Sequence, residues 1–192
     1  MNQGPLPRHV EAKLLKRWRE PHRRYHAEGH LRAGLETLQW LGAGPLEFVA
    51  FWFHDAVHTG ESPGDELASA DLARELLHGI LSEAAIGEVC RLVLLTVDHS
   101  PERDDPAGAR VADADLQGVG LPWESYVANL EAIRAEHPGI SPADWATRRR
   151  RFVSRMLERD TVFHTAKGLA LWERQARVNL LREAGQLSAS SW

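Results

Sequence analysis

Apolar residues recur at the spacing of an α-helix along most of this chain, and glycine or proline interrupts each run. Leucines share one face between Leu31 and Leu41, and Gly42 ends that stretch. Pro45 then stands where a new helix can begin. Strand-like alternation does not persist anywhere, although residues 91–97 are rich enough in β-branched side chains to be ambiguous. The pattern predicts an all-α fold, as a single compact multi-helix domain over residues 1–192.

Polar and proline-containing segments mark the expected loops between these helices. The stretch from Thr59 to Gly64 is rich in Gly, Ser and Pro and predicts a loop, after which Asp65 can cap a helix. The stretch from Ser100 to Gly108 is polar, contains two prolines and predicts a second loop. We expect a short helix to follow Asp113.

Composition excludes several broad classes of protein. The net charge of −4 argues against a general nucleic-acid binder, which is usually basic. The single cysteine, Cys90, cannot form a disulfide within the chain and fits a reducing compartment. Residues 1–7 are polar and lack the apolar stretch of a signal peptide. Apolar runs fall short of the roughly 20 residues that span a bilayer, so we expect a cytoplasmic protein without a membrane partner.

The doublet His54-Asp55 closes an aromatic, apolar stretch that begins at Phe51. Both side chains are expected to lie largely within the protein, where an unpaired charge is costly. A divalent cation offsets that cost, because it accepts imidazole nitrogen and carboxylate oxygen together. A doublet alone is also consistent with a histidine that meets the last carbonyls of a helix.

Two further motifs, one before and one after the doublet, strengthen the metal hypothesis: a segment that ends in His30, and Asp113-Ala114-Asp115. In this order the chain resembles the HD-domain superfamily of metal-dependent phosphohydrolases, and within it a bacterial subgroup of predicted HD phosphohydrolases. The resemblance covers residues from about 21 to 183, the expected core of the domain. The residues that carry it are Arg23, Tyr25, His26, His30, Phe53, His54, Asp55, Glu66, Ser69, Ala70, Thr96, His99, Asp113, Ala114, Asp115, Leu116, Gly120, Glu173, Ala176, Arg177, Asn179 and Leu180.

The resemblance implies an all-helical scaffold that gathers these ligands around one divalent metal ion, which can be Mn, Fe, Zn, Co, Ni or Mg. The implied ligands are His30, His54, Asp55 and one aspartate of the last motif. Asp113 and Asp115 both qualify, and on a helix they would face nearly opposite ways. We favour Asp113, because it can open the short helix and face the core, with Asp115 as the alternative.

Four other residues are candidates for contact with the substrate or for catalysis. Arg23 can clamp a phosphate group through two parallel hydrogen bonds, or lie in a solvated charge cluster. His26, one helical turn before His30, can contact the substrate or bond to the backbone. Glu66 is the candidate general acid or base, although a glutamate in a first helical turn also suits the helix dipole. His99 is a further candidate for substrate binding.

The resemblance implies a hydrolase that cleaves a phosphate ester or anhydride with metal-activated water, and Asp55 then serves catalysis as a metal ligand. The substrate is a small phosphorylated molecule such as a nucleotide. A non-catalytic metal-binding regulatory or ligand-sensing protein is the alternative, because intact ligands do not separate the two. The run from Arg148 to Arg151 is typical of a solvated helix face, so specific binding of nucleic acid is not expected.

Overall fold

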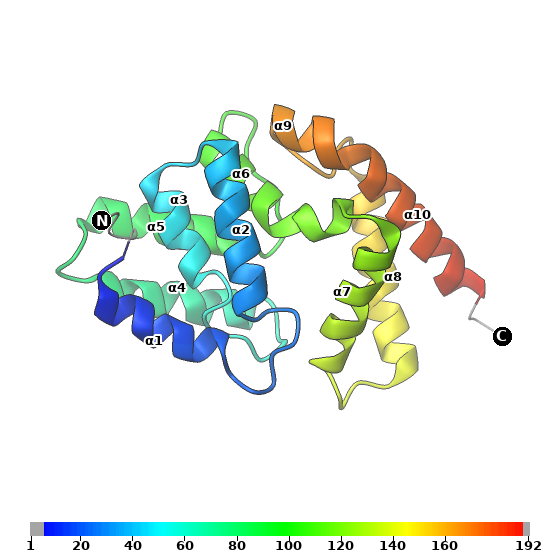
Figure 1. Cartoon of the computed structure of the whole chain (residues 1–192), viewed down its shortest axis with the longest axis horizontal. Helices are drawn as coiled ribbons and strands as arrows, with labels where there is room; N and C mark the ends of the chain where they lie inside the picture. The colour runs from blue at the N-terminus through cyan, green and yellow to red at the C-terminus, as the bar shows by residue number, and fades with distance from the viewer. Residues whose placement is uncertain (1–5, 190–192) are drawn as a thin grey trace. The chain divides into compact units, whose positions relative to one another are not determined.

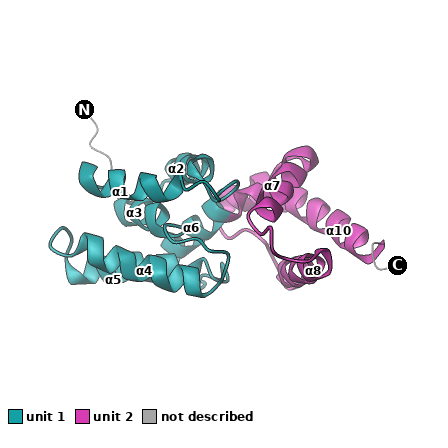
Figure 2. Ribbon diagram, turned by 90° about the horizontal axis from the view of Figure 1, so that it is seen from below, with its two compact units in different colours: residues 1–115 teal, residues 116–192 magenta. Residues whose placement is uncertain are grey.

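The computed structural model describes residues 6–189, and over this range the chain forms helices and loops without a strand, as Figure 1 shows. The predicted all-α fold is therefore confirmed. The expected single domain consists of two compact units, residues 1–115 (unit 1) and residues 116–192 (unit 2), which Figure 2 distinguishes by colour. Within the described range, none of the helices combines the length and apolar character that a membrane span needs.

Unit 1 is a bundle of helices around a large apolar core. Its elements are α1 (Arg8–Trp18), α2 (Glu28–Leu41), α3 (Pro45–Phe53), α4 (Gly64–Leu77), α5 (Glu83–Leu95) and nearly all of α6 (Pro106–Leu116). Helix α5 packs against both α3 and α4, and α2 packs against α3. Trp18, Phe51 and Phe53 are among the largest fully buried side chains of this core. The packing places the end of α3 inside the unit.

Local chemistry defines the ends of the helices that matter for the site. Helix α2 ends at Gly42, whose φ of 82° lies in the left-handed region that glycine adopts without strain. Pro45 is the first residue of α3, and the Glu47 side chain accepts a hydrogen bond of 2.6 Å from the Gly44 N–H. These signals fix where α3 begins and therefore which residue follows its last turn.

A close approach between α2 and α3 depends on Gly34. A Cβ atom at this position would collide with Cζ and Cε1 of Phe51 and would lie 3.0 Å from Cε2. The Phe51 side chain is fully buried in the core. The missing side chain at Gly34 therefore lets the aromatic end of α3 pack directly against α2.

Helix α6 begins earlier than the sequence pattern suggested. We expected a loop from Ser100 to Gly108 and a short helix after Asp113, but α6 starts at Pro106. The reason is an N-terminal cap, because Asp105 Oδ1 accepts a hydrogen bond of 2.9 Å from the Gly108 N–H and Pro106 follows it. Both members of the aspartate pair consequently lie in the later turns of an established helix.

Unit 2 has its own, smaller apolar core, to which Leu116, Met156 and Phe163 contribute. Its elements are η1 (Gln117–Gly120), α7 (Trp123–Ala135), α8 (Pro142–Glu158), α9 (Ala166–Gly168), η2 (Leu169–Glu173) and α10 (Arg174–Ala189). Helices α8 and α10 pack against each other.

The arginine run on α8 is only partly a solvated face. Arg148, Arg150 and Arg151 are exposed, but Arg149 turns toward α10. Its Nε lies 2.8 Å from Oε1 of the buried Glu183, which also accepts a hydrogen bond from the Tyr126 hydroxyl. Burial is the first cause that raises the pKa of Tyr126 above its usual value, and Glu183 adds to it, while Arg149 opposes the shift. This arginine therefore stabilises unit 2.

Candidate metal centre

Four side chains of the types that can ligate a metal lie close together inside unit 1. His30 lies in the first turn of α2, His54 and Asp55 directly follow α3, and Asp115 lies in the last turn of α6. The Nε2 atoms of the two histidines are 3.2 Å apart. Asp115 Oδ1 lies 3.0 Å from His30 Nε2 and 3.5 Å from His54 Nε2. Asp55 Oδ2 lies 3.1 Å from His54 Nε2 and 3.8 Å from His30 Nε2.

The two histidines are held on an apolar floor, and the two carboxylates face partly outward. His54 is 1% exposed, and its ring centroid lies 4.2 Å from that of Phe51 and 5.5 Å from that of Trp18. The side chains of Asp55 and Asp115 are 18% and 15% exposed. The histidine side of the cluster is therefore enclosed by aromatic side chains, and its acidic side is partly exposed to solvent.

One backbone carbonyl sets the tautomer of His54. The Nδ1 atom donates a hydrogen bond of 2.8 Å to the Phe51 carbonyl in the last turn of α3. A neutral His54 consequently carries its lone pair on Nε2, which faces His30 and both carboxylates. Histidine ligands of metal ions are commonly fixed in this way, with the second ring nitrogen bonded to a carbonyl or carboxylate.

The two carboxylates of the cluster favour a positive charge beside them. Burial alone would lower the pKa of His54, but the carboxylates of Asp55 and Asp115 outweigh it and raise this pKa well above its usual value. Burial would raise the pKa of both carboxyls, but His54 holds the pKa of each below its usual value. A proton on His54 or a divalent cation can supply the positive charge that this arrangement favours.

The donor set fits a divalent metal ion. Two imidazole nitrogens and two carboxylate oxygens are a combination that Zn, Mn, Fe and Co accept. Donors about 2.1 Å from a common ion are about 3.0–3.4 Å apart at octahedral or tetrahedral angles. The separations given above run from 3.0 to 3.8 Å. The ligand atoms of His30, His54 and Asp115 all lie within 4.8 Å of one another and could hold an ion, and Asp55 lies beside them near both histidines.

The structure reverses the sequence-based preference between the two aspartates. Asp115 faces both histidines, whereas Asp113 is fully buried two residues earlier on α6. Successive helical residues are rotated by about 100°, so the two side chains point nearly opposite ways. Asp113 does not open a short helix, because α6 already begins at Pro106. Asp115 is therefore the geometric candidate for the fourth ligand.

His99 contacts the centre through Asp115. Its Nε2 atom lies 2.7 Å from Asp115 Oδ2, the carboxylate oxygen other than the one near the histidine pair. The His99 side chain is 13% exposed. The contact that the structure gives this residue is thus with a candidate ligand, while the sequence suggested a contact with substrate.

Arg23 does not have the surroundings of a phosphate clamp. Its side chain is 0% exposed, which leaves no surface for an incoming anion. Its Nη1 donates to the carbonyls of His26 and Asp55 at 2.9 and 2.8 Å, and its Nη2 donates to the Ala56 carbonyl at 3.3 Å. The guanidinium instead ties the segment before α2 to the doublet after α3.

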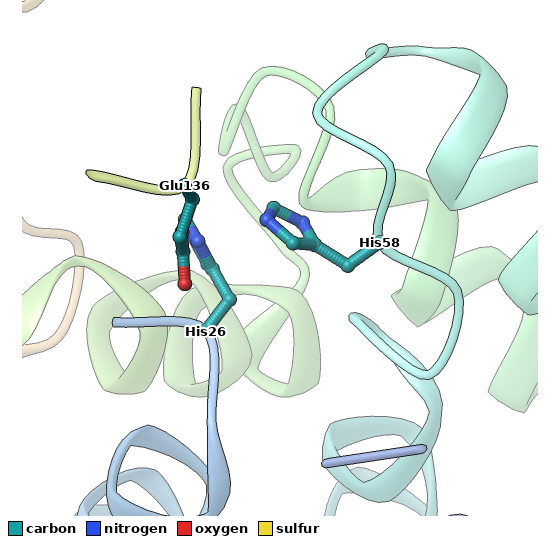
Figure 3. Close-up of side chains that lie close together, drawn as sticks. All are labelled: His26, His58 and Glu136. Atoms are coloured by element: carbon teal, nitrogen blue, oxygen red, sulfur yellow. The ribbon is translucent and has the colours of Figure 1, made fainter. Parts of the chain in front are cut away.

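His26 lies beside the centre, and its predicted contact with the substrate stays a prediction. Its ring centroid is 5.9 Å from that of His30. Burial raises the pKa of Asp55, but His54 and then His26 lower it below its usual value. His58 lies next to it with a centroid separation of 4.3 Å, so that two half-buried imidazoles from two loops are neighbours (Figure 3). No motif in the sequence marks His58, because its neighbour His26 is distant in the chain.

Glu66 occupies the first turn of α4, in agreement with its expected place at a helix start. Its Oε2 atom is buried and has no hydrogen-bond partner among residues 6–189. Buried polar atoms normally have a partner, so this oxygen is suited to a group that the protein does not itself supply. Glu66 stays a candidate acid or base.

The converging donors from α2, α3 and α6 are the feature of unit 1 that points most directly to a function. Three of these residues, His30, His54 and Asp115, form a group that could hold a metal ion. Comparison with protein-family models, with curated proteins and with solved structures found no match. The case for a bound metal ion therefore rests on the geometry of the centre.

Proposed function

We propose that this chain is a metal-dependent phosphohydrolase that cleaves a phosphate ester or anhydride of a nucleotide or related small molecule. The observation that carries the proposal is the convergence of two imidazole nitrogens and two carboxylates in unit 1, with His30 and Asp115 only 3.0 Å apart. The reaction class comes from the resemblance of these residues to the HD-domain superfamily. The geometry supports the binding of a metal ion, and it does not bear on the reaction class.

Each ligand has a separable part in this centre. His30 and His54 supply neutral nitrogen donors, and the Phe51 carbonyl keeps the His54 lone pair directed at the cluster. Asp55 and Asp115 supply the negative charge that attracts a dication. A divalent ion bound here would lower the pKa of a bound water and polarise a phosphoryl oxygen. Four protein donors leave coordination positions open on an ion that takes up to six.

Residues beside the centre can receive the phosphorylated substrate. The partly exposed carboxylates mark the open side, and His26 with its neighbour His58 offers imidazole N–H groups to phosphate oxygens. Glu66 is the proposed proton donor or acceptor, because its buried Oε2 has no hydrogen-bond partner among the described residues.

Metal content tests the centre first. The purified protein, stripped with a chelator and then reloaded in turn with Mn²⁺, Fe²⁺, Co²⁺, Ni²⁺, Zn²⁺ or Mg²⁺, should bind one ion per chain by elemental analysis. Asp115→Asn should lose most of that affinity, and Asp113→Asn, two residues away on α6, should retain it in a folded protein. The opposite result for the two variants would return Asp113 to the role of ligand.

Turnover of a panel of phosphate monoesters, nucleotides and phosphoanhydrides tests the activity. Asp55→Ala removes an anionic ligand and should abolish metal binding and nearly all hydrolysis, whereas His78→Ala, on an exposed residue after α4, should behave as the unaltered protein. Glu66→Gln should keep the metal and lose about 10²–10⁴ in rate. Normal turnover by Asp55→Ala refutes the mechanism, and bound metal without turnover of any compound favours a sensing role.

A further inference from the structure

His99 occupies an unusual backbone position at the end of α5. Its φ of 55° lies in the left-handed region, and it is the non-glycine residue with this geometry in the described part of the chain. Its N–H donates a hydrogen bond of 2.8 Å to the Leu95 carbonyl, which closes the helix. Glycine is the usual residue at such a helix end, because a Cβ makes the conformation costly. A histidine here needs a compensating use for its side chain.

The imidazole of His99 contacts one carboxylate oxygen of Asp115, while the other oxygen faces His30. His99 Nε2 lies 2.7 Å from Oδ2, so it donates its proton to that oxygen, while Oδ1 lies 3.0 Å from His30 Nε2. A carboxylate free to rotate about its Cβ–Cγ bond would not hold one oxygen toward the ligands. The hydrogen bond from His99 fixes this rotation.

The segment between α5 and α6 is itself anchored. Arg91 on α5 forms two hydrogen bonds with the Asp105 carboxylate, of 2.6 and 3.2 Å, and Asp105 also caps α6. Helix α5, which His99 follows, is thereby tied to the start of the helix that carries Asp115. This anchoring keeps the donor and acceptor in register.

We propose that His99 is a positioning residue, held in a left-handed conformation at the end of α5 so that its ring orients Asp115 toward the metal centre. The inference rests on the metal centre of the proposed function, and it replaces the substrate-binding role that the sequence suggested for His99. The proposal predicts that replacing His99 by glycine lowers the affinity for metal without lowering the melting temperature of the metal-free protein.

The substitution His99→Gly separates the two effects. Glycine relieves the left-handed backbone, so the melting temperature of the metal-free protein should stay the same or rise. Loss of the ring should weaken Mn²⁺ or Zn²⁺ binding by about 10–100-fold, the usual effect of removing a group that orients a ligand. The absorption spectrum of the Co²⁺-loaded protein should also change. His99→Gln, whose Nε2 can donate to the same carboxylate, should recover part of the affinity.

A matched control is His78→Gly, which makes the same change at an exposed residue after α4 and should leave metal affinity unchanged. The proposal is overturned if His99→Gly binds metal with unaltered affinity and an unaltered Co²⁺ spectrum. It is also overturned if the unaltered protein binds no metal, which removes the centre altogether. A protein that binds metal and hydrolyses no phosphate compound contradicts the proposed activity only, and a loss of affinity in His99→Gly would then still support this inference.

Discussion

Replacing Gly34 by alanine would place a methyl group where the Phe51 ring lies, since a Cβ there would collide with Cζ and Cε1. Two effects oppose each other. Alanine in a helix interior is more favourable than glycine by about 1 kcal/mol. Overpacking a tightly filled core costs about 1–3 kcal/mol. Because Phe51 is fully buried, the second effect should dominate, and Gly34→Ala should reduce the free energy of unfolding by up to about 2 kcal/mol.

Gly87 offers a matched control on α5. It is exposed, and a Cβ atom there meets nothing within 4 Å. Gly87→Ala should therefore raise the free energy of unfolding by about 0.5–1 kcal/mol. The difference between the two variants isolates the steric cost at Phe51, about 1–3 kcal/mol, from helix propensity. Urea unfolding at equilibrium, followed by circular dichroism, measures both variants under the same conditions.

The same substitution should reach the metal centre, because the Phe51 carbonyl accepts the Nδ1–H of His54. Gly34→Ala should weaken metal binding, and Gly87→Ala should not. Adding Phe51→Leu, which removes the colliding atoms, should restore stability to Gly34→Ala by a coupling free energy of about 0.5–3 kcal/mol. Equal stabilisation by alanine at both glycines would refute the close packing of α2 against α3 that underlies this reasoning.

Two further predictions concern Arg23 and Asp65. Arg23→Met should reduce the free energy of unfolding by about 1–3 kcal/mol, since it leaves three backbone carbonyls without their donor. The exposed control Arg32→Met should cost about 0.5 kcal/mol or less, and a loss of substrate affinity without a loss of stability would support the phosphate clamp instead. Burial would raise the pKa of Asp65, but hydrogen bonds from Thr59 and the next two backbone N–H groups lower it overall. A lowered pKa in the folded state means stability that is present above the unfolded pKa of about 3.9 and lost as pH falls below it. Asp65→Asn should consequently be less stable at pH 7, and its deficit should shrink in urea titrations below about pH 4; a deficit independent of pH would contradict the assignment.

Helical periodicity was enough to predict the all-α fold, and burial explains the one ambiguous segment. The part of residues 91–97 up to Leu95 belongs to α5, where Leu92 and Val93 are fully buried in the core. The division into two units could not be predicted, because α6 leads directly into η1 without a polar linker. Composition marks a boundary only where the joining segment is exposed.

The candidate ligands could be named from their order in the sequence, but their geometry could not. Which of Asp113 and Asp115 faces the histidines depends on how α6 is rotated about its axis. That rotation depends on where α6 begins, and its start at Asp105-Pro106 lies in a segment whose composition predicts a loop. The role of Arg23 was hidden because its partners are backbone carbonyls, which every residue possesses. That these residues bind a metal stays a prediction.

The ligands of the centre come from helices that are distant in sequence, and this spacing has a thermodynamic consequence. An ion held by residues of α2, α3 and α6 would join three segments of unit 1 that separate when the chain unfolds. An ion that binds only the folded state stabilises that state by about 2.7 kcal/mol when the free ion concentration is 100 times the dissociation constant. The chain has a single cysteine and forms no internal disulfide. The ion would then act as a cross-link, so that the supply of metal would change the stability of unit 1.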